Sequence, residues 1–297
     1  MLKNKQLIVI GGPTAIGKTA TAITLAKKYN TEIISADSRQ VYRQLNIGVG
    51  RPDTEQLNTV SHHLIATIDI EQHYHASNFE QDALDILKNI YQHKNKAIVC
   101  GGTGLYIQAL CDGLDDMPKV DFEIRSTLNK RFEEEGISFL QQIVKENDPE
   151  LFKTIDILNH KRLIRAAEII IQTGKPYSYF RKGRKSNRYF SSKFFCLYNT
   201  KDVIKKNITI RVHKMFESGW LDECIQLYPL RHLKALQTVG YKEIFQHLDG
   251  AYTYDETIEL IITRTYQYAK RQLTWFKRDD RYHWVKNVEE IENILEA

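Results

Sequence analysis

Residues 7–19 read LIVIGGPTAIGKT, and this stretch decides the fold. Its first residues, Leu7-Ile8-Val9-Ile10, form a short apolar run that ends in glycines, which is typical of a buried parallel strand. Residues 12–19 match G-x-x-x-x-G-K-[ST]. A helical pattern follows directly, with an apolar side made of Ala22, Ile23, Leu25 and Ala26. A strand before the motif and a helix after it predict a phosphate-binding P-loop.

Each part of this loop has a physical use in binding phosphate. Gly12 and Gly17 let the backbone wrap closely, so that amide groups point at phosphate oxygens, and the following helix adds its positive N-terminal end. Lys18 supplies a point charge for the terminal phosphate, and the Thr19 hydroxyl is placed to ligate Mg²⁺. A chance match in a turn is the alternative, which the context disfavours. The predicted diphosphate- or triphosphate-binding residues are Gly12, Pro13, Thr14, Ala15, Ile16, Gly17, Lys18 and Thr19.

Further apolar runs predict the rest of a sheet. Strand patterns occupy four more ranges, namely 32–36, 97–100, 194–198 and 282–285. Helical patterns lie between them, as at residues 78–93, which we expect Ser77 or Asn78 to cap. Strands that alternate with helices predict parallel βαβ units. We therefore predict an α/β fold of the P-loop NTPase-like kind, an open parallel sheet with helices on both faces.

The pattern changes between the third and fourth predicted strands, where only helical patterns occur. The clearest helix runs from Lys161 to Thr173. Its apolar face is expected to consist of Leu163, Ile164, Ala167, Ile170 and Ile171. We predict a core domain of residues 1–117 with about 191–297, and a helical insertion at about 118–190.

The charge of the chain is unevenly distributed. The whole sequence carries a net charge of only +5, but residues 153–193 hold eleven Lys or Arg against two acids, Asp156 and Glu168. A local basic surface of this kind suits a polyanion such as nucleic acid. The residues alone favour a solvated, flexible charged loop about equally.

Two more loops are expected at the sheet edge that carries the P-loop. Asp37 follows the second predicted strand, and an open α/β sheet binds ligands at that edge. Asp37 can serve as a Mg²⁺ partner, as a general base, or only as the N-cap of a following helix. Residues 101–104, Gly-Gly-Thr-Gly, close the third strand, and Thr103 offers a hydroxyl there. The plain alternative for this segment is a strand-to-helix turn.

The composition is that of a globular protein, with 42% hydrophobic and 27% charged residues. No apolar run approaches the length of a membrane span, and the Ile-Val-Ile run of the first strand pattern is too short for the apolar region of a signal peptide. We therefore expect a cytoplasmic protein with no membrane partner. The cysteines lack a C-x-x-C pair, so we expect neither zinc nor disulfides. We interpret each as a small buried hydrophobe: Cys100, Cys111, Cys196 and Cys224.

Three loops together resemble one family. GPTAIGKT at 12–19, DSRQVY at 37–42 and GGTGLY at 101–106 are similar, in this order and spacing, to the tRNA dimethylallyltransferases, which modify the adenosine 3′ of the anticodon. The resemblance covers nearly the whole chain, and no single motif carries it. The other matching segments are Asn46-Ile47-Gly48 with Pro52, His62-His63-Leu64-Ile65, and residues 161–168, 173–176, 239–243 and 268–276.

The resemblance implies a reaction. The P-loop would hold the diphosphate of dimethylallyl diphosphate, with Mg²⁺ on Thr19, and Asp37 would take a proton from the adenine N6 amine. Lys18, the loop amides and Mg²⁺ would stabilise the departing pyrophosphate, so the implied catalytic residues are Asp37, Lys18 and Thr19. The product would be N6-(dimethylallyl)adenosine at position 37 of the tRNA.

The resemblance also implies a partner, the anticodon stem-loop of a tRNA, bound by a monomeric enzyme. The target nucleotide must be flipped out of the stack to reach the pocket, where Thr103 and Gln40 would contact it. The implied tRNA-binding residues are Asp37, Ser38, Arg39, Gln40, Thr103, Arg125, Lys161, Arg162, Leu163, Ile164 and Arg165. The charges of residues 161–168 have a second interpretation, as the wet side of an amphipathic helix.

The sequence departs from the family pattern at two places. Arg51 stands where the family usually has lysine, and Asn207 stands where it tends to carry an arginine thought to help at the diphosphate. Arginine and lysine bind with different shapes, so the substitution changes any contact made there. We hypothesise that Arg211 or Arg51 takes the role of the missing arginine.

Other functions use the same residues. A small-molecule P-loop kinase would place ATP at the loop, which is the nucleotide that fold analogy alone predicts, and Asp37 would activate a hydroxyl. That reading leaves the basic residues 153–193 and the segment 268–276 unexplained. A prenyltransferase for free adenine nucleotides is disfavoured by the same basic residues. A nucleic-acid-binding protein with a decayed P-loop conflicts with the intact Lys18, Thr19 and Asp37.

Overall fold

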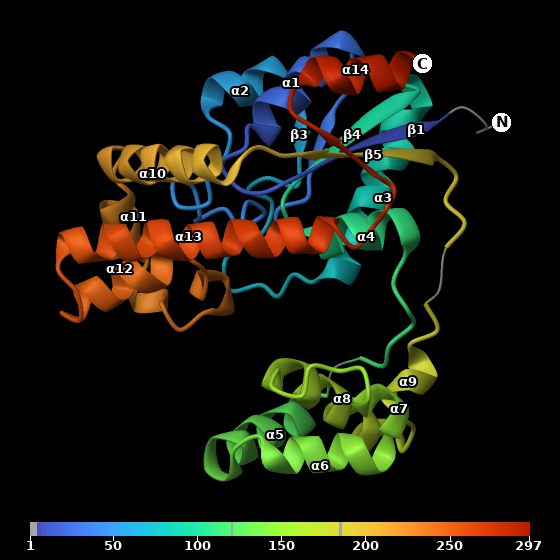
Figure 1. The fold of residues 1–297 in the computed structure, drawn as a ribbon, viewed down its shortest axis with the longest axis vertical. Helices are drawn as coiled ribbons and strands as arrows, with labels where there is room; N and C mark the ends of the chain where they lie inside the picture. The colour runs from blue at the N-terminus through green and yellow to red at the C-terminus, as the bar shows by residue number, and fades with distance from the viewer. Residues whose placement is uncertain (1–4, 120, 184–185) are drawn as a thin grey trace. The chain divides into compact units, whose positions relative to one another are not determined.

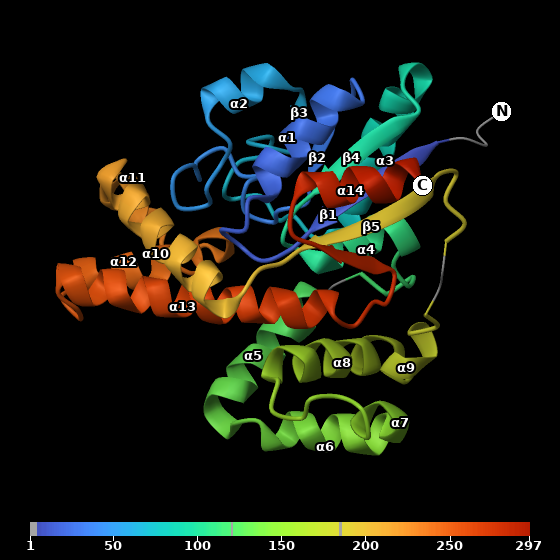
Figure 2. The same cartoon turned by 45° about the horizontal axis from the view of Figure 1, so that its top comes forward.

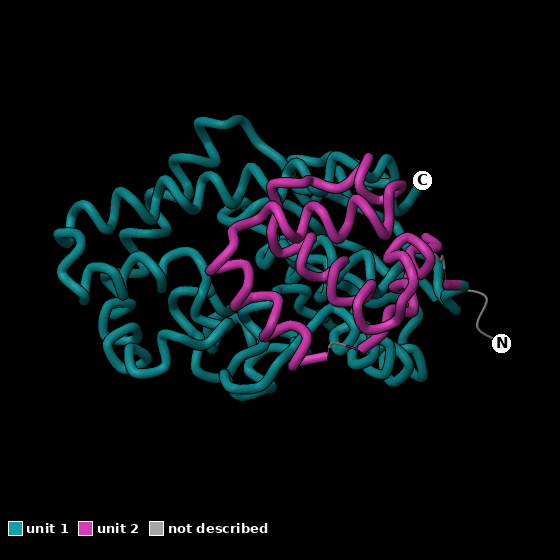
Figure 3. The backbone as a smooth tube through the Cα atoms, turned by 90° about the horizontal axis from the view of Figure 1, so that it is seen from below, with its two compact units in different colours: residues 1–111, 187–297 teal, residues 112–186 magenta. Residues whose placement is uncertain are grey.

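The computed structural model describes residues 5–119, 121–183 and 186–297. The chain separates into two compact units, drawn in different colours in Figure 3. Unit 1 comprises Met1–Cys111 and Asn187–Ala297, and unit 2 comprises Asp112–Ser186. Both unit boundaries therefore lie a few residues before the domain boundaries expected near 118 and 190.

Unit 1 is built on one open sheet, shown in Figure 1. Within the described residues the sheet has six strands in the order β3-β2-β4-β1-β5-β6, and every neighbouring pair is parallel. The strands are β1 (Gln6–Gly11), β2 (Ile33–Ser35), β3 (His62–His63), β4 (Lys96–Cys100), β5 (Ser191–Leu197) and β6 (Tyr282–Val285). The predicted open parallel α/β sheet is confirmed. The two-residue strand β3 was not predicted, because a run so short has no periodicity to detect.

Helices cover both faces of the sheet, and successive side chains of β1 pack against one helix layer and then the other. Leu7 and Val9 pack with α3 (Ala76–His93) and α4 (Gly104–Asp112). Ile8 and Ile10 pack instead with α1 (Lys18–Lys28) and α14 (Val288–Glu296). Figures 1 and 2 show these two helix layers on opposite sides of the strands. The continuous apolar run of β1 is thus explained by burial of the strand on both faces of the sheet, as predicted.

The start of α3 differs from the expected one. The helix begins at Ala76, its N-cap is His75, and the Asn78 side chain accepts a hydrogen bond from the His75 amide at 3.0 Å. The predicted cap at Ser77 or Asn78 is therefore wrong. Asn78 does help to close the first turn, but from the third position of the helix rather than from the cap.

The C-terminal part of unit 1 forms a second apolar cluster beside the sheet. Residues of α10 (Lys201–Glu217) and α13 (Tyr254–Phe276), including Ile208, Val212 and Ile261, are buried in it. The two helices lie side by side in Figures 1 and 2. The other elements of this region are α11 (Trp220–Leu227), η1 (Tyr228–Leu230), η2 (Lys234–Leu236) and α12 (Tyr241–Leu248), whereas α2 (Thr54–Thr59) lies between β2 and β3 in the chain. No helix in the described ranges is both long and apolar enough for a membrane crossing.

Unit 2 is helical, as predicted. Its helices are α5 (Phe122–Glu135), α6 (Ser138–Asn147), α7 (Pro149–Phe152), α8 (His160–Thr173) and α9 (Tyr177–Phe180). Helix α8 is the centre of the core, and it is buried on more than one face because Ala166 and Ile169 are buried as well as Leu163. Ile171 in its last turn is 50% exposed, so its predicted place on the apolar face is wrong. Burial of this helix depends on its several neighbours and not on one stripe.

Candidate active site

The P-loop connects β1 to α1 through three residues with positive φ. Gly12 has φ 143°, Ala15 has φ 61° and Gly17, the N-cap of α1, has φ 96°. A Cβ on Gly12 would lie 2.8 Å from the Leu197 carbonyl oxygen, so this position has room only for glycine. Ala15 pays about 1–2 kcal/mol for its left-handed backbone. The Asn207 amide nitrogen donates to the Ala15 carbonyl at 3.2 Å, which holds that conformation from α10.

Lys18 lies over this loop with its ammonium group directed back to the beginning of the motif. Its Nζ donates to the Pro13 carbonyl oxygen at 2.7 Å. The pKa of Lys18 is lowered to about 8, mainly by burial and in smaller part by the positive charge of Arg211, while the Cys100 and Asp37 side chains oppose the shift. The ammonium is therefore still charged at neutral pH, in a poorly hydrated position where a cation binds phosphate strongly.

An open cavity of about 1050 Å³ lies beside the loop. Of the predicted phosphate-binding residues, Thr14 to Thr19 line it, whereas Gly12 and Pro13 are buried and do not belong to its lining. Asp37 and Arg211 line the same cavity. The structure thus brings the predicted cationic loop and the predicted carboxylate to one site, although they are separated by a helix and a strand in the chain.

A second, smaller cavity of about 220 Å³ adjoins the first. Ser38 and Arg39 line it together with apolar side chains. Six residues line both cavities and mark where they meet: Thr14, Asp37, Val49, Arg211, Met215 and Tyr268. Two reactants that enter from the two cavities can therefore meet at Asp37.

Asp37 is not a helix cap, because the residues after it form turns. Its Oδ1 accepts hydrogen bonds from the amides of Arg39 at 2.9 Å and Gln40 at 3.3 Å. This Asx-type turn fixes the carboxylate at the end of β2. No described residue donates a hydrogen bond to Oδ2. The second oxygen is thus available to accept a proton or to face a ligand.

The two other residues expected at the target nucleotide have bonds inside the protein. The Thr103 hydroxyl accepts from the Ser38 amide at 3.1 Å, which joins the turn after β4 to the turn that carries Asp37. The Gln40 amide accepts from the Ser35 hydroxyl at 2.9 Å and donates to the Gly50 carbonyl at 3.0 Å. Both ends of Gln40 are engaged, so its side chain supports the 49–50 loop, and Gln40 also lines the larger cavity. Its contact with the target nucleotide stays a prediction. Thr103 retains its own hydroxyl proton for donation.

The structure distinguishes between Arg51 and Arg211, the two arginines that we considered for the role of the family arginine missing at Asn207. Arg51 donates to the carbonyls of Tyr42 and Arg43 at 3.0 Å and 2.9 Å, and also to that of Leu45, so it supports a backbone turn. Arg211 lines both cavities, and burial lowers its pKa while Asp37 opposes the shift. Within the described ranges the Arg211 guanidinium has no hydrogen-bonded partner. Arg211 is therefore the arginine that remains available to a bound anion.

Two residues at the site, Tyr268 and Gln272, were assigned no role from the sequence. Both lie on α13 and line the larger cavity. Burial raises the pKa of Tyr268 to about 12, with the Asp37 charge as a smaller cause, so its hydroxyl stays protonated. Their spacing of four residues places them on one face of a helix. The signal that could have found them is their position in the segment 268–276, one of the stretches with family resemblance.

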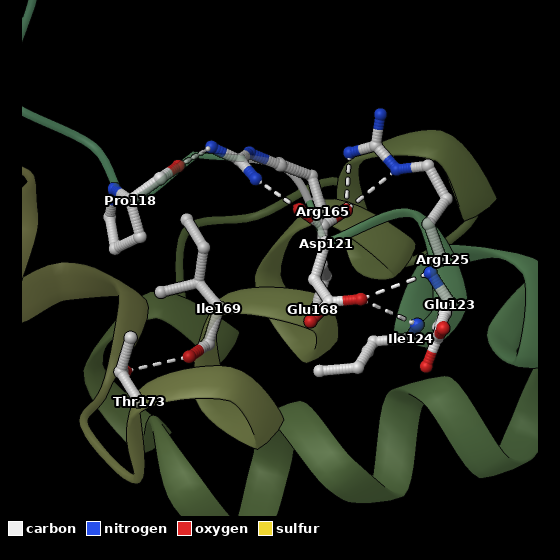
Figure 4. Close-up of polar contacts among 9 residues, drawn as sticks. All are labelled: Pro118, Asp121, Glu123, Ile124, Arg125, Arg165, Glu168, Ile169 and Thr173. Atoms are coloured by element: carbon white, nitrogen blue, oxygen red, sulfur yellow. Dashed lines mark hydrogen bonds and ion pairs between the residues drawn. The ribbon is translucent and has the colours of Figure 1, made fainter.

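In unit 2 the expected tRNA-binding residues fall into two groups. Figure 4 shows Arg125 from α5 and Arg165 from α8 both directed at the Glu168 carboxylate, which is fully buried. Arg125 Nε donates to Glu168 at 2.6 Å, and Arg165 also donates to the Pro118 carbonyl at 2.8 Å. This cluster holds the start of the unit against α8. Both arginines are still about one quarter exposed, at 26% and 25%.

The remaining expected contacts on α8 differ sharply in exposure. Leu163 is 0% exposed and Ile164 is 5% exposed, so their side chains belong to the core and offer no surface to RNA. Lys161 and Arg162 are exposed at the first turn of the helix. Other basic residues of the 153–193 segment, such as Lys175, are also exposed, whereas Arg184 and Lys185 lie outside the described residues.

We predict that Glu168→Gln lowers the free energy of unfolding by about 2 kcal/mol, because it leaves two partly buried guanidinium groups without their carboxylate. Urea denaturation of the full chain measures this change. The control is Glu150→Gln, which removes the exposed pair with Lys153 and should change stability by less than about 0.5 kcal/mol. Equal effects of the two substitutions would show that burial of Glu168 contributes nothing.

Comparison with known proteins adds independent evidence. A model of the IPP transferase family matches residues 40–279. The tRNA dimethylallyltransferase of Christiangramia forsetii is 45% identical over 99% of this chain and 97% of its own length. The tRNA dimethylallyltransferase 2 of Azobacteroides pseudotrichonymphae is 41% identical over 97% of this chain and 94% of its own length.

Solved structures agree with these relatives. The tRNA isopentenylpyrophosphate transferase of Bacillus halodurans superimposes with a TM-score of 0.72 at 34% identity, covering 99% of this chain and 96% of that one. A eukaryotic dimethylallyltransferase acting on tRNA superimposes with a TM-score of 0.79 at 28% identity, covering 91% of this chain and 69% of that one. With a matching family model, close relatives of nearly equal length and the same fold, the chain belongs to the IPP transferase family.

Proposed function

We propose that this protein transfers a dimethylallyl group from dimethylallyl diphosphate to N6 of adenosine 37, next to the anticodon, in tRNA. The observation that carries the proposal is the shared cavity in which the P-loop cation Lys18 faces the same space as Asp37. A diphosphate leaving group needs the first residue, and an amine nucleophile needs the second. Family membership supplies the donor and the acceptor.

The chemistry follows from the properties of the two reactants. The adenine N6 amine is a weak nucleophile because its lone pair is delocalised into the ring, so the allylic carbon must be made electrophilic. The bond between that carbon and the diphosphate oxygen breaks, and pyrophosphate leaves with the electron pair. The bond from N6 to the carbon forms, and the N6 proton passes to Oδ2 of Asp37. Alignment of the two reactants across the adjoining cavities provides much of the remaining rate.

The leaving group is the place where this site can stabilise charge. Lys18, the helix N-terminus and Arg211 lie around the larger cavity and would bind the pyrophosphate oxygens as charge develops on them. Lys18 is held in place before the reaction by its hydrogen bond to the Pro13 carbonyl, and Arg211 is carried on helix α10 beside the cavity. Such preorganised groups stabilise the transition state more than solvent water does.

Mg²⁺ is part of this proposal. Among the described residues no group of three or more His, Cys, Asp or Glu is arranged to hold a metal, so the chain offers no cage of its own. This fits Mg²⁺, which keeps several waters and usually binds through one or two protein oxygens together with substrate phosphates. Thr19 lines the cavity and would supply the protein ligand. When bound, Mg²⁺ would neutralise charge on the pyrophosphate.

The tRNA would be held by basic residues and by the rim of the smaller cavity. Exposed Lys161 and Arg162 are the strongest candidates in unit 2, with the free sides of Arg125 and Arg165 as further phosphate contacts. The flipped adenine would enter beside Ser38 and Arg39. A tRNA substrate also favours the cytoplasm as the compartment and is compatible with a monomer.

The test is incubation with labelled dimethylallyl diphosphate and an unmodified tRNA anticodon stem-loop, with γ-labelled ATP and with free AMP as acceptor in parallel. Label in the RNA at N6 of adenosine 37 supports the proposal. Prenylation of AMP but not of RNA would identify the free-nucleotide reaction instead. Phosphate transfer from ATP without prenyl transfer would identify a kinase and overturn the proposal.

We predict that Arg211→Ala raises the KM for dimethylallyl diphosphate about 10- to 100-fold, because a buried cation that can bind the diphosphate is removed. Steady-state kinetics at saturating RNA measure the change. Arg264→Ala, on the exposed side of α13, is the control and should leave KM unchanged. Arg51→Ala should lower stability with little change in KM, since its guanidinium binds backbone carbonyls. A KM effect at Arg51 but not at Arg211 would reverse the assignment.

A further inference from the structure

Gln272 connects two loops that are far apart in the chain. It lies on α13 and is 6% exposed. Its Oε1 accepts a hydrogen bond from the amide of Thr14 in the P-loop at 2.8 Å. Its Nε2 donates to the carbonyl of Gly102, in the turn after β4, at 3.0 Å. One neutral side chain therefore satisfies both loops.

The second of these loops leads directly to Asp37. Gly102 precedes Thr103, whose hydroxyl accepts from the Ser38 amide at 3.1 Å and whose amide donates to the Ala36 carbonyl at 3.2 Å. These two hydrogen bonds are made to Ala36 and Ser38, the residues directly before and after Asp37. A continuous set of hydrogen bonds thus runs from the diphosphate loop through Gln272 to the backbone on both sides of the carboxylate.

Close packing fixes Gln272 at this position. A Cβ on Gly102 would lie 2.0 Å from Gln272 Nε2, and a Cβ on Gly104 would lie 2.1 Å from the Trp275 ring. A Cβ on Gly11, at the end of β1, would lie 2.7 Å from the Phe276 ring. Glycine at these three places allows α13 to approach the edge of the sheet. The distance from helix to loops is therefore set by backbone contact.

The chemistry of glutamine suits this position. An amide is an acceptor on one oxygen and a donor on its nitrogen, and it carries no charge that would compete with Lys18 or Asp37 for a ligand. Tyr268 lies one helical turn before Gln272 on α13 and lines both cavities. A glutamate side chain has the same shape but would lack the N–H donor for the Gly102 carbonyl. Methionine would lack both bonds.

We propose that Gln272 is a positioning residue that holds the diphosphate loop and the Asp37 turn in register, so that the leaving group and the base act on aligned reactants. The inference rests on the proposed function for the identity of those reactants. The alternative is that Gln272 has a purely structural role and only stabilises the fold. The two differ in kinetics, because misalignment lowers the rate of the chemical step and a lost fold contact lowers stability alone.

The experiment compares Gln272→Met and Gln272→Glu with wild type in single-turnover prenylation of the tRNA stem-loop. Affinity for inorganic pyrophosphate is measured by calorimetry, and the melting temperature is recorded for each variant. We expect both substitutions to lower the single-turnover rate at least 10-fold while the Kd for pyrophosphate stays within threefold. The matched controls are Gln267→Met and Gln267→Glu on the same helix, where the side chain accepts a hydrogen bond from Arg264 and lines neither cavity, so the rate should stay within twofold.

Several outcomes would overturn the inference. A rate within twofold of wild type for folded Gln272→Met shows that the bridge does not align the reactants. An equal loss in rate and pyrophosphate affinity shows that Gln272 serves the diphosphate loop alone. If Gln272→Met does not fold, Gln272→Glu decides by the same criteria, because it keeps the acceptor for Thr14. Failure of wild type to prenylate RNA would instead contradict the proposed function.

Discussion

Asp37→Asn is expected to lower kcat for tRNA prenylation about 10³-fold and to leave the affinity for pyrophosphate within threefold. The amide oxygen of asparagine can still accept from the Arg39 and Gln40 amides, so the turn after β2 keeps its shape. What is lost is the carboxylate oxygen that would accept the N6 proton in the proposed reaction. General-base catalysis typically contributes about 10²- to 10⁴-fold to a rate, which sets the size of the effect.

Steady-state kinetics and calorimetry with pyrophosphate separate the possible roles of Asp37. The control is Asp85→Asn on the exposed side of α3, which should leave both quantities unchanged. If pyrophosphate binding were lost along with the rate, Asp37 would be a metal-binding or structural residue. An unchanged rate would remove the base from the proposed mechanism altogether.

Lys18→Met has the second largest expected effect, a loss in kcat/KM of about 10²- to 10³-fold. The substitution removes the cation but keeps most of the side-chain volume in the P-loop. The loss should appear in both diphosphate affinity and rate, since negative charge is present on the substrate and increases on the departing pyrophosphate. Lys27→Met, an exposed lysine later in α1, is the matched control. A loss confined to stability would make Lys18 a structural residue.

Lys18 also gives this site a defined pH dependence. Burial lowers its pKa to about 8, so in the free protein the group is charged below that pH and becomes neutral above it. A bound diphosphate favours the charged form, and above pH 8 binding must therefore include uptake of a proton. Affinity for dimethylallyl diphosphate should fall by up to about tenfold per pH unit above 8. Calorimetry from pH 6.5 to 9.5 would show this fall in wild type and its absence in Lys18→Met.

The sequence by itself determined the phosphate loop, because everything that makes it lies within a few residues. The apolar run of β1, the glycines with positive φ at 12 and 17, and the start of α1 are local features, and local features leave a local pattern. The parallel sheet followed for the same reason, since strands buried on both faces read as continuous apolar runs. Asp37 could be placed at the correct sheet edge from its position after β2.

Contacts between distant parts of the chain could not be predicted in this way. Helix α8 shows the limit within one unit. Its apolar residues were recognised by their spacing, but that spacing did not reveal that Arg165 would pair with buried Glu168 or that Arg125 of α5 would share the same carboxylate. An exposed basic helix face and a buried ion-pair cluster have the same sequence pattern.

Only the tertiary structure decided how the active site is held together. Gln272 is 258 residues from Thr14 and 170 from Gly102, and Asn207 is 192 residues from Ala15. No periodicity records such pairs, because the side chains meet only after α10 and α13 pack beside the sheet. The sequence by itself predicted which groups would bind phosphate and which could accept a proton. The packing of two late helices decided that these groups face one cavity, because hydrogen bonds between remote segments form only when burial brings those segments together.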